Sequence, residues 1–198
     1  MKTLILLLPV LVAITTSCSN IRSKQLVGAE PVDLTAVGAQ DISGEWINKD
    51  GEVIGRIEVT NATKGEILFT PAKKEGEEQG EAAKISIRSS NDYVFLNYEP
   101  DEKGERRWYL LGGGNNEFLI WSPDNDAFRK LIADGKIKGR NDPDTKKDAQ
   151  GNEVEKQNAG AVIDDPQGEW VEKLAAGGFG VPFDWKNPMV LRKKVVAK

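Results

Sequence analysis

The sequence of 198 residues contains no histidine and only one cysteine, Cys18. The lack of histidine excludes Ser-His-Asp and Cys-His relays, the common catalytic zinc sites, and imidazole acid–base catalysis near neutral pH. One cysteine cannot form an internal disulfide bond. An enzyme made from this chain would therefore depend on paired carboxylates, as glycosidases do. No spacing among the 31 acidic residues singles out such a pair.

Excess positive charge is also absent. The chain has 27 lysines and arginines against 31 aspartates and glutamates, and its net charge is -4. No basic field favours a phosphate backbone, so we predict no nucleic-acid partner. The hydrophobic content of 39% is sufficient for a buried core, and nothing in the sequence indicates a cofactor.

Hydrophobic runs long enough to span a membrane are missing, since a spanning helix needs about 20 apolar residues. The one marked run, Thr3 to Ile14, follows Lys2 and has the length of a signal-peptide core. Small residues, Thr15 to Ser17, then lead to Cys18. This order resembles a bacterial lipoprotein signal. The resemblance implies that the Cys18 thiol carries a diacylglycerol, that acyl chains such as palmitate anchor the protein, and that Cys18 is the first mature residue.

The alternative is an unmodified cysteine inside a signal peptide that an ordinary signal peptidase removes. The lipoprotein interpretation explains the single cysteine of an exported chain, and each buried acyl methylene contributes about 0.8 kcal/mol to membrane attachment. Ser19 is not the aspartate that retains some lipoproteins in the inner membrane. We therefore predict a signal peptide over 1–17, a lipidated tether over 18–40, and a place in the bacterial cell envelope, at the outer membrane facing the periplasm.

From Ile42 onward, short runs of alternating apolar and polar residues are separated by turn residues. Residues 53–59 follow the Asp50-Gly51 pair, a strong hairpin signal, and show the period of two that is typical of a half-buried strand. This spacing predicts an antiparallel meander, whose closure into a barrel would remove exposed edges. The predicted strands are 43–47, 53–59, 65–71, 83–88, 92–99, 105–111, 117–121, 161–163 and 188–195.

Two short helices are predicted in the C-terminal half of a barrel domain that spans 41–195. The first covers about 125–133 and starts after Asp124, and the second covers 166–176 and ends at Gly177-Gly178. Between them, residues 139–160 form a polar segment longer than a normal connection, which we interpret as a mobile and dispensable insertion.

The insertion contains four carboxylates that resemble a calcium-binding loop: Asp142, Asp144, Asp148 and Glu153. Hard oxygen ligands of this kind suit a hard cation. However, Lys146 and Lys147 put positive charge where the ion would lie. We therefore predict no bound metal and treat the segment as a solvated loop.

The Gly44-Glu45-Trp46 triplet, followed by a meander and a late helix, resembles the lipocalin-like small β-barrels. The further order of Trp121 to Asp124, Glu169 to Val171 and Pro188 to Arg192 looks like a group of bacterial lipoproteins. The resemblance implies a mainly β fold, an antiparallel meander that closes into a lipocalin-like barrel. It also implies that Trp46 closes one barrel end beneath a basic side chain, Arg192 or else Lys193. An ordinary core tryptophan is the alternative.

Three functions compete. The first is a non-enzymatic binding module that holds a small apolar or amphipathic ligand in a cavity. The second is an envelope interaction lipoprotein whose barrel is filled by its own side chains, with another envelope protein as partner. The third is a carboxylate-dependent hydrolase. Large side chains expected inside the barrel would either line a cavity or fill it: Tyr93, Phe95, Trp108 and Phe118.

Overall fold

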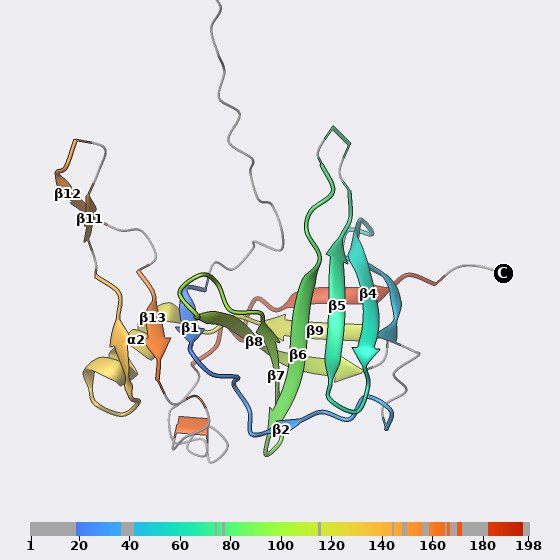
Figure 1. The fold of residues 1–198 in the computed structure, drawn as a ribbon, viewed down its shortest axis with the longest axis horizontal. Helices are drawn as coiled ribbons and strands as arrows, with labels where there is room; N and C mark the ends of the chain where they lie inside the picture. Colours follow the sequence, from blue (N-terminus) through green and yellow to red (C-terminus); the bar gives the residue numbers. More distant parts are fainter. Residues whose placement is uncertain are drawn as a thin grey trace, which may run out of the picture.

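The computed structural model describes residues 19–36, 42–73, 75, 76, 78–114, 116–143, 145–147, 150–155, 159–164, 166, 170, 171 and 182–195. Its main feature is a closed barrel of eight antiparallel strands (Figure 1). In chain order they are β3 (Gly44–Ile47), β4 (Val53–Asn61), β5 (Glu66–Pro71), β6 (Ala83–Ser90), β7 (Tyr93–Tyr98), β8 (Arg106–Gly114), β9 (Glu117–Trp121) and β14 (Met189–Lys193). The predicted mainly β fold and the predicted meander are confirmed.

The barrel closes through β14, which lies between the first and the last strand of the meander. Leu191 of β14 pairs with Phe118 of β9, and Arg192 pairs with Ile47 of β3. Since β9 also pairs with β8, every barrel strand has two neighbours. Closure thus leaves none of the eight strands as an edge of the barrel.

A second, smaller sheet continues from the start of β8. It consists of β1 (Ile21–Ser23), β13 (Ala161–Ile163) and β10 (Gly139–Asn141). The β1–β13 pair is parallel, and the other pairs of this extension are antiparallel. Strand β2 (Glu30–Pro31) pairs with the end of β6, and β11 (Thr145–Lys147) forms a separate hairpin with β12 (Glu153–Glu155).

The predicted tether is instead part of the fold over residues 19–36. Ile21 and Val27 are 1% and 0% exposed, and Leu34 is also buried. The buried Asn97 side chain donates to the Val27 carbonyl and accepts from its N–H, at 3.0 and 2.7 Å. Three buried apolar side chains and the pairing of β1 with β13 and β8 outweigh the low local periodicity that predicted a tether.

A close backbone approach fixes the start of this N-terminal segment. A Cβ atom added at Gly160 would lie 2.1 Å from the Asn20 carbonyl oxygen, so only glycine fits there. The same carbonyl accepts a hydrogen bond from Ala161 N at 3.3 Å. The chain entering β1 therefore lies tightly against the chain entering β13.

Helix α2 (Asn125–Ala133) begins as predicted. The Asp124 carboxylate caps it by accepting from Ala127 N at 3.0 Å, and Phe128 is its buried residue. Of the second predicted helix, only Pro166, Trp170 and Val171 lie within the described residues. The fold as described thus has one helix where two were predicted. No helix among the described residues is long and apolar enough to cross a membrane.

The polar insertion is shorter than 139–160. Its first residues form β10, Asp142 is 7% exposed, and Ala159 and Gly160 are buried before β13. The charges of Arg140 and Asp142 predicted a solvated loop, because Glu105 and Arg22, which bind them in the fold, are distant in the sequence. Within the described residues, the part that extends outward is the β11–β12 hairpin (Figure 1).

Candidate functional site

The barrel interior contains what we call the barrel core: Leu34, Ile42, Trp46, Ile57, Ile67, Phe69, Ile85, Ile87, Leu96 and Leu191. Trp46 is fully buried, and its ring stacks on Phe118 with centroids 4.4 Å apart and planes at 6°. Its indole Nε1 donates to the Ile42 carbonyl at 2.9 Å. This part of the barrel is occupied by the protein's own side chains.

Tyr98 and Tyr109 face the same interior and make an edge contact, with ring centroids 5.8 Å apart. Burial, followed by the neighbouring Tyr109, raises the pKa of the Tyr98 hydroxyl above its ordinary value. Tyr98 is therefore a neutral residue of the barrel at physiological pH and offers no ionised group to a ligand.

Three of the four residues expected at an internal cavity lie on the outer face of the barrel wall, which β7 and β8 form here. Phe95, Trp108 and Tyr93 belong to a second cluster, while Phe118 packs against the barrel core. The reason is the period of two along a strand, which places Leu96 inside and its neighbour Phe95 outside. The strands β7 and β8 are buried on both faces, so residue size alone could not indicate which face is internal.

The second cluster, which we call the side core, packs between the outer face of β7 and β8, the N-terminal segment, α2 and β13. Its residues are Ile21, Val27, Phe95, Trp108, Leu110, Phe128, Ile137, Ala161, Ile163, Trp170, Val171 and Phe183. Trp108 is central, with centroid distances of 5.5, 5.6 and 6.1 Å to Phe128, Trp170 and Phe183. The Trp108 Nε1 atom is buried without a hydrogen-bond partner, so this core is held by apolar and ring contacts.

The structure places Arg192 outside the barrel, so Arg192 does not stack on Trp46, whose ring stacks on Phe118. The Arg192 guanidinium pairs with Glu117 at 2.7 Å, and its side chain is 57% exposed. Lys193, the other basic candidate, lies directly opposite Trp46 in the β3–β14 register. Alternation along β14 explains the outward position of Arg192, because Leu191 points inward and the next residue must point outward.

A buried charge cluster joins the small sheet to the barrel. Arg22 contacts Glu105 at 2.8 Å and also contacts Asp142, and Arg140 contacts Glu105 and lies 3.7 Å from Asp142. The carboxylate side chains of Glu105 and Asp142 are only 3% and 8% exposed. Two guanidinium groups balance two carboxylates, so this pair of acids has a structural role and does not resemble a glycosidase dyad.

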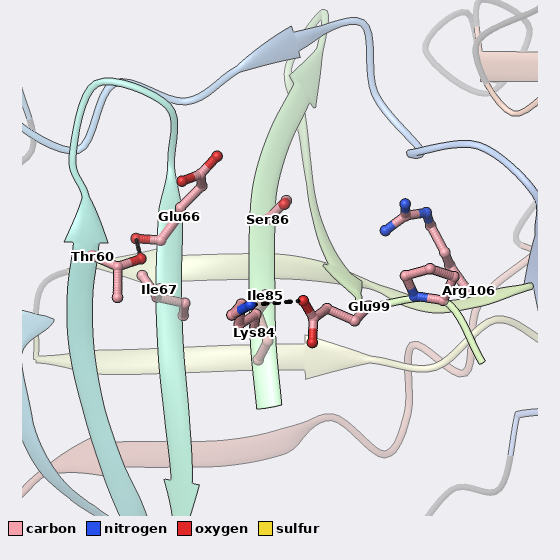
Figure 2. Close-up of a pocket in the computed structure, with 9 residues that line it drawn as sticks. Thr60, Glu66, Ile67, Lys84, Ile85, Ser86, Glu99 and Arg106 are labelled. Atoms are coloured by element: carbon pink, nitrogen blue, oxygen red, sulfur yellow. Dashed lines mark hydrogen bonds and ion pairs between the residues drawn. The ribbon is translucent and has the colours of Figure 1, made fainter. Parts of the chain in front are cut away.

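A polar pocket of about 250 Å³ lies on the outer face of β5 and β6 (Figure 2). It is lined by Thr60, Glu66, Ile67, Lys84, Ile85, Ser86, Glu99, Pro100 and Arg106. Lys84 and Glu99, which line it, form an ion pair at 3.4 Å, and Glu66 and Arg106 lie on opposite sides of Ser86. Charges of both signs therefore surround this pocket, which sequence reasoning missed because its residues come from separate strands.

Among the residues that the structure describes, no group of three acidic or cysteine side chains could hold a metal ion. Of the proposed calcium ligands, Asp142 is engaged by the two arginines and Glu153 is exposed. Asp144 and Asp148 lie outside the described residues, and so does Cys18, the predicted lipidation site.

Comparison with protein-family models, with curated proteins and with solved structures finds no match to this chain. The function of the chain is therefore inferred from its own residues and their geometry.

Proposed function

We propose that this chain is a lipid-anchored protein of the bacterial cell envelope, attached through Cys18, that binds another protein through its surface. The observation that carries the proposal is the position of the large aromatic rings relative to the barrel. Trp46 stacks on Phe118 inside it, and Phe95 and Trp108, expected to line a cavity, belong to the side core. A barrel of eight strands has room for little beyond its own side chains once large rings occupy it.

The lipocalin-like interpretation is supported by the position of Gly44-Glu45-Trp46 on β3, beside the closing strand β14. In lipocalins this arrangement accompanies an internal ligand, so a carrier of a small apolar molecule is the competing function. The two functions differ in one property, because a carrier needs free internal volume and an interaction module does not.

An apolar fluorescent probe distinguishes these two functions. We expect the Cys18→Ser protein, purified without detergent, to leave the probe fluorescence unchanged, because large side chains occupy the barrel core. Phe118→Ala removes the ring that stacks on Trp46 and should open a cavity that binds the probe. Phe118→Tyr, which keeps the ring, is the matched control. Probe binding by the unaltered protein, or a retained small molecule in native mass spectrometry, would favour the carrier.

The polar pocket on β5 and β6 is the surface that we propose for the protein partner. Its mixed charges suit a polar segment with complementary charges. Arg106→Glu should abolish chemical cross-linking to an envelope partner in intact cells, whereas Lys49→Glu, at an exposed turn before β4, should leave it unchanged. Equal cross-linking in both variants would show that the partner binds elsewhere.

A further inference from the structure

The first described residue, Ser19, is held firmly against the start of α2. Its side chain and backbone are only 7% exposed, and its hydroxyl lies 3.4 Å from the Asn125 side-chain oxygen, to which it donates. The Asn20 N–H donates to the same oxygen at 3.0 Å, and the Ile21 N–H donates to the Ser19 hydroxyl at 3.3 Å. The chain is thus fixed from its first described residue.

This placement determines where a lipid on Cys18 would be attached. Consecutive Cα atoms are about 3.8 Å apart across a trans peptide bond. A lipidated Cys18 would therefore join the bilayer directly to the start of α2, with no flexible spacer between the acyl chains and the folded domain.

A second segment lies beside the same start of α2. Asp124 N donates to the Pro182 carbonyl at 2.8 Å, and Asp184 N donates to the Ser122 carbonyl at 3.1 Å. These bonds place residues 182–184 alongside residues 122–124, immediately before the residue that holds Ser19. Trp185 follows in a turn, where its N–H donates to the Phe183 carbonyl at 2.9 Å.

Trp185 is the unusual residue of this turn. Its side chain is 38% exposed, and Val195 is the other large hydrophobic residue exposed within the described part of the chain. One side of the indole packs against Trp121 and Phe183, with ring centroids 5.4 and 5.6 Å away. The ring is therefore held in place while part of it faces solvent, and the exposed Lys186 follows it.

We infer that the start of α2 and the 182–187 turn form the membrane-facing surface of the protein, with Trp185 inserted among the lipid headgroups. The inference rests on the proposed acylation of Cys18. From Trp121 to Asn125 an extended chain spans roughly 13 Å, so Trp185 lies close to the anchor point. Tryptophan is enriched at membrane interfaces because its ring is apolar and its N–H is polar.

Acyl chains and the indole hold this surface on the membrane, and charge contributes little. Asp124, Asp126 and Asp184 lie on or near it together with Lys186, so the surface has no excess of positive charge. Membrane association of the acylated protein is therefore insensitive to salt, unlike that of a protein held by a basic patch.

The test uses the full-length acylated protein in vesicles of phosphatidylethanolamine and phosphatidylglycerol. Lys186→Cys and, as matched control, Lys49→Cys each receive an environment-sensitive fluorophore. Both lysines are exposed turn residues, and Lys49 precedes β4, which lies across the barrel from β8 and the small sheet (Figure 1). Acylation blocks the Cys18 thiol as a thioether, so only the introduced cysteine reacts.

We expect the label at position 186 to show a blue shift and to lose quenching by iodide when vesicles are present, and the label at 49 to behave as in water. Adding Trp185→Ser should reduce the shift at 186. Equal behaviour of the two labels in protein whose mass confirms acylation would overturn the orientation alone. An unacylated mass, with a second labelled thiol, would overturn the lipid anchor and this inference with it.

Discussion

The two cores of this protein are built in different ways. The barrel core is mainly aliphatic and comes from consecutive strands of one meander, apart from Leu34, Ile42 and the closing strand. The side core has a larger share of aromatic residues, five of its twelve, and brings together the N-terminal segment, β7, β8, α2, β13 and residues near 170 and 183. β7 and β8 are the shared wall, with Leu96 on one face and Phe95 on the other.

This difference indicates which of the two cores should unfold first. The barrel closes mostly through the short loops of the meander, with one long closure by β14, whereas nearly every segment of the side core is distant in sequence from the others, from Ile21 to Phe183. More long loops must therefore close to form the side core, at a larger cost in entropy. Buried polar contacts compensate for this cost, since Asn97 holds Val27 and the charge cluster joins β1, β10 and the start of β8. We expect the side core to open before the barrel.

The largest expected effect is that of Trp108→Ala. Truncating a buried tryptophan costs about 3 to 5 kcal/mol of unfolding free energy, because a cavity remains. Trp108 contacts four other rings, so the side core should loosen while the barrel stays closed. Urea unfolding followed by far-ultraviolet circular dichroism and by tryptophan fluorescence should give two separate transitions. Trp108→Phe is the control, and coincident transitions in Trp108→Ala would show that the two cores unfold as one unit.

Glu105→Gln tests the charge cluster. Breaking a buried ion pair costs about 3 to 5 kcal/mol, and we expect about 2 to 3 kcal/mol because Arg140 is half exposed to solvent. The matched control is Glu117→Gln, which breaks the exposed pair with Arg192 and should cost less than about 1 kcal/mol. Chemical denaturation measures both variants. Equal losses of unfolding free energy in the two variants would mean that the buried cluster stabilises the side core no more than an exposed ion pair would.

Asn97→Ala should release the N-terminal segment. The substitution leaves the Val27 N–H and carbonyl without their side-chain partner, at a cost of about 1 to 2 kcal/mol. Limited trypsin digestion should then cut faster after the exposed Lys24, while cleavage after Lys103, in the β7–β8 turn, provides the internal control. Unchanged cleavage at Lys24 would show that the segment is held by its apolar contacts alone.

Arg192→Ala should have little effect, below about 1 kcal/mol, since its ion pair with Glu117 lies at the surface. Trp46→Ala, by contrast, should cost about 3 to 5 kcal/mol. Thermal melts of the two variants compare them directly. A large loss for Arg192→Ala would indicate that a basic side chain does help to close the barrel.

The smallest effect concerns pH. Hydrogen bonds from the backbone N–H groups of Glu105 and then Lys103 hold the pKa of Asp101 below its ordinary value of 3.8. A lowered pKa in the folded state adds stability that is present above pH 3.8 and is lost as pH falls through the folded value. Asp101→Asn should therefore remove a small part of the acid sensitivity. The same acid melting curve in both proteins would contradict this.

Strand boundaries were predictable to within a few residues for the barrel, as β4 and β9 illustrate. Their alternation and the turns beside them, such as Asp50-Gly51, are local signals. β1, β2 and β10 were missed because each has only two or three residues and depends on a partner distant in the sequence. Asp142 was interpreted as part of a solvated loop for the same reason, because its partner Arg22 is distant in the sequence.

The alternation of the strands, the turns and the start of α2 were predictable because these properties depend on near neighbours along the chain. The exclusion of catalysis by histidine followed from the composition alone. Which face of β7 and β8 is internal, by contrast, became evident only from the folded chain. Both faces carry large apolar residues, so Phe95 and Leu96 are equivalent in a pattern of period two. The direction in which the sheet curves, and the segments that cover its outer face, settle the choice, and both depend on contacts between distant parts of the chain.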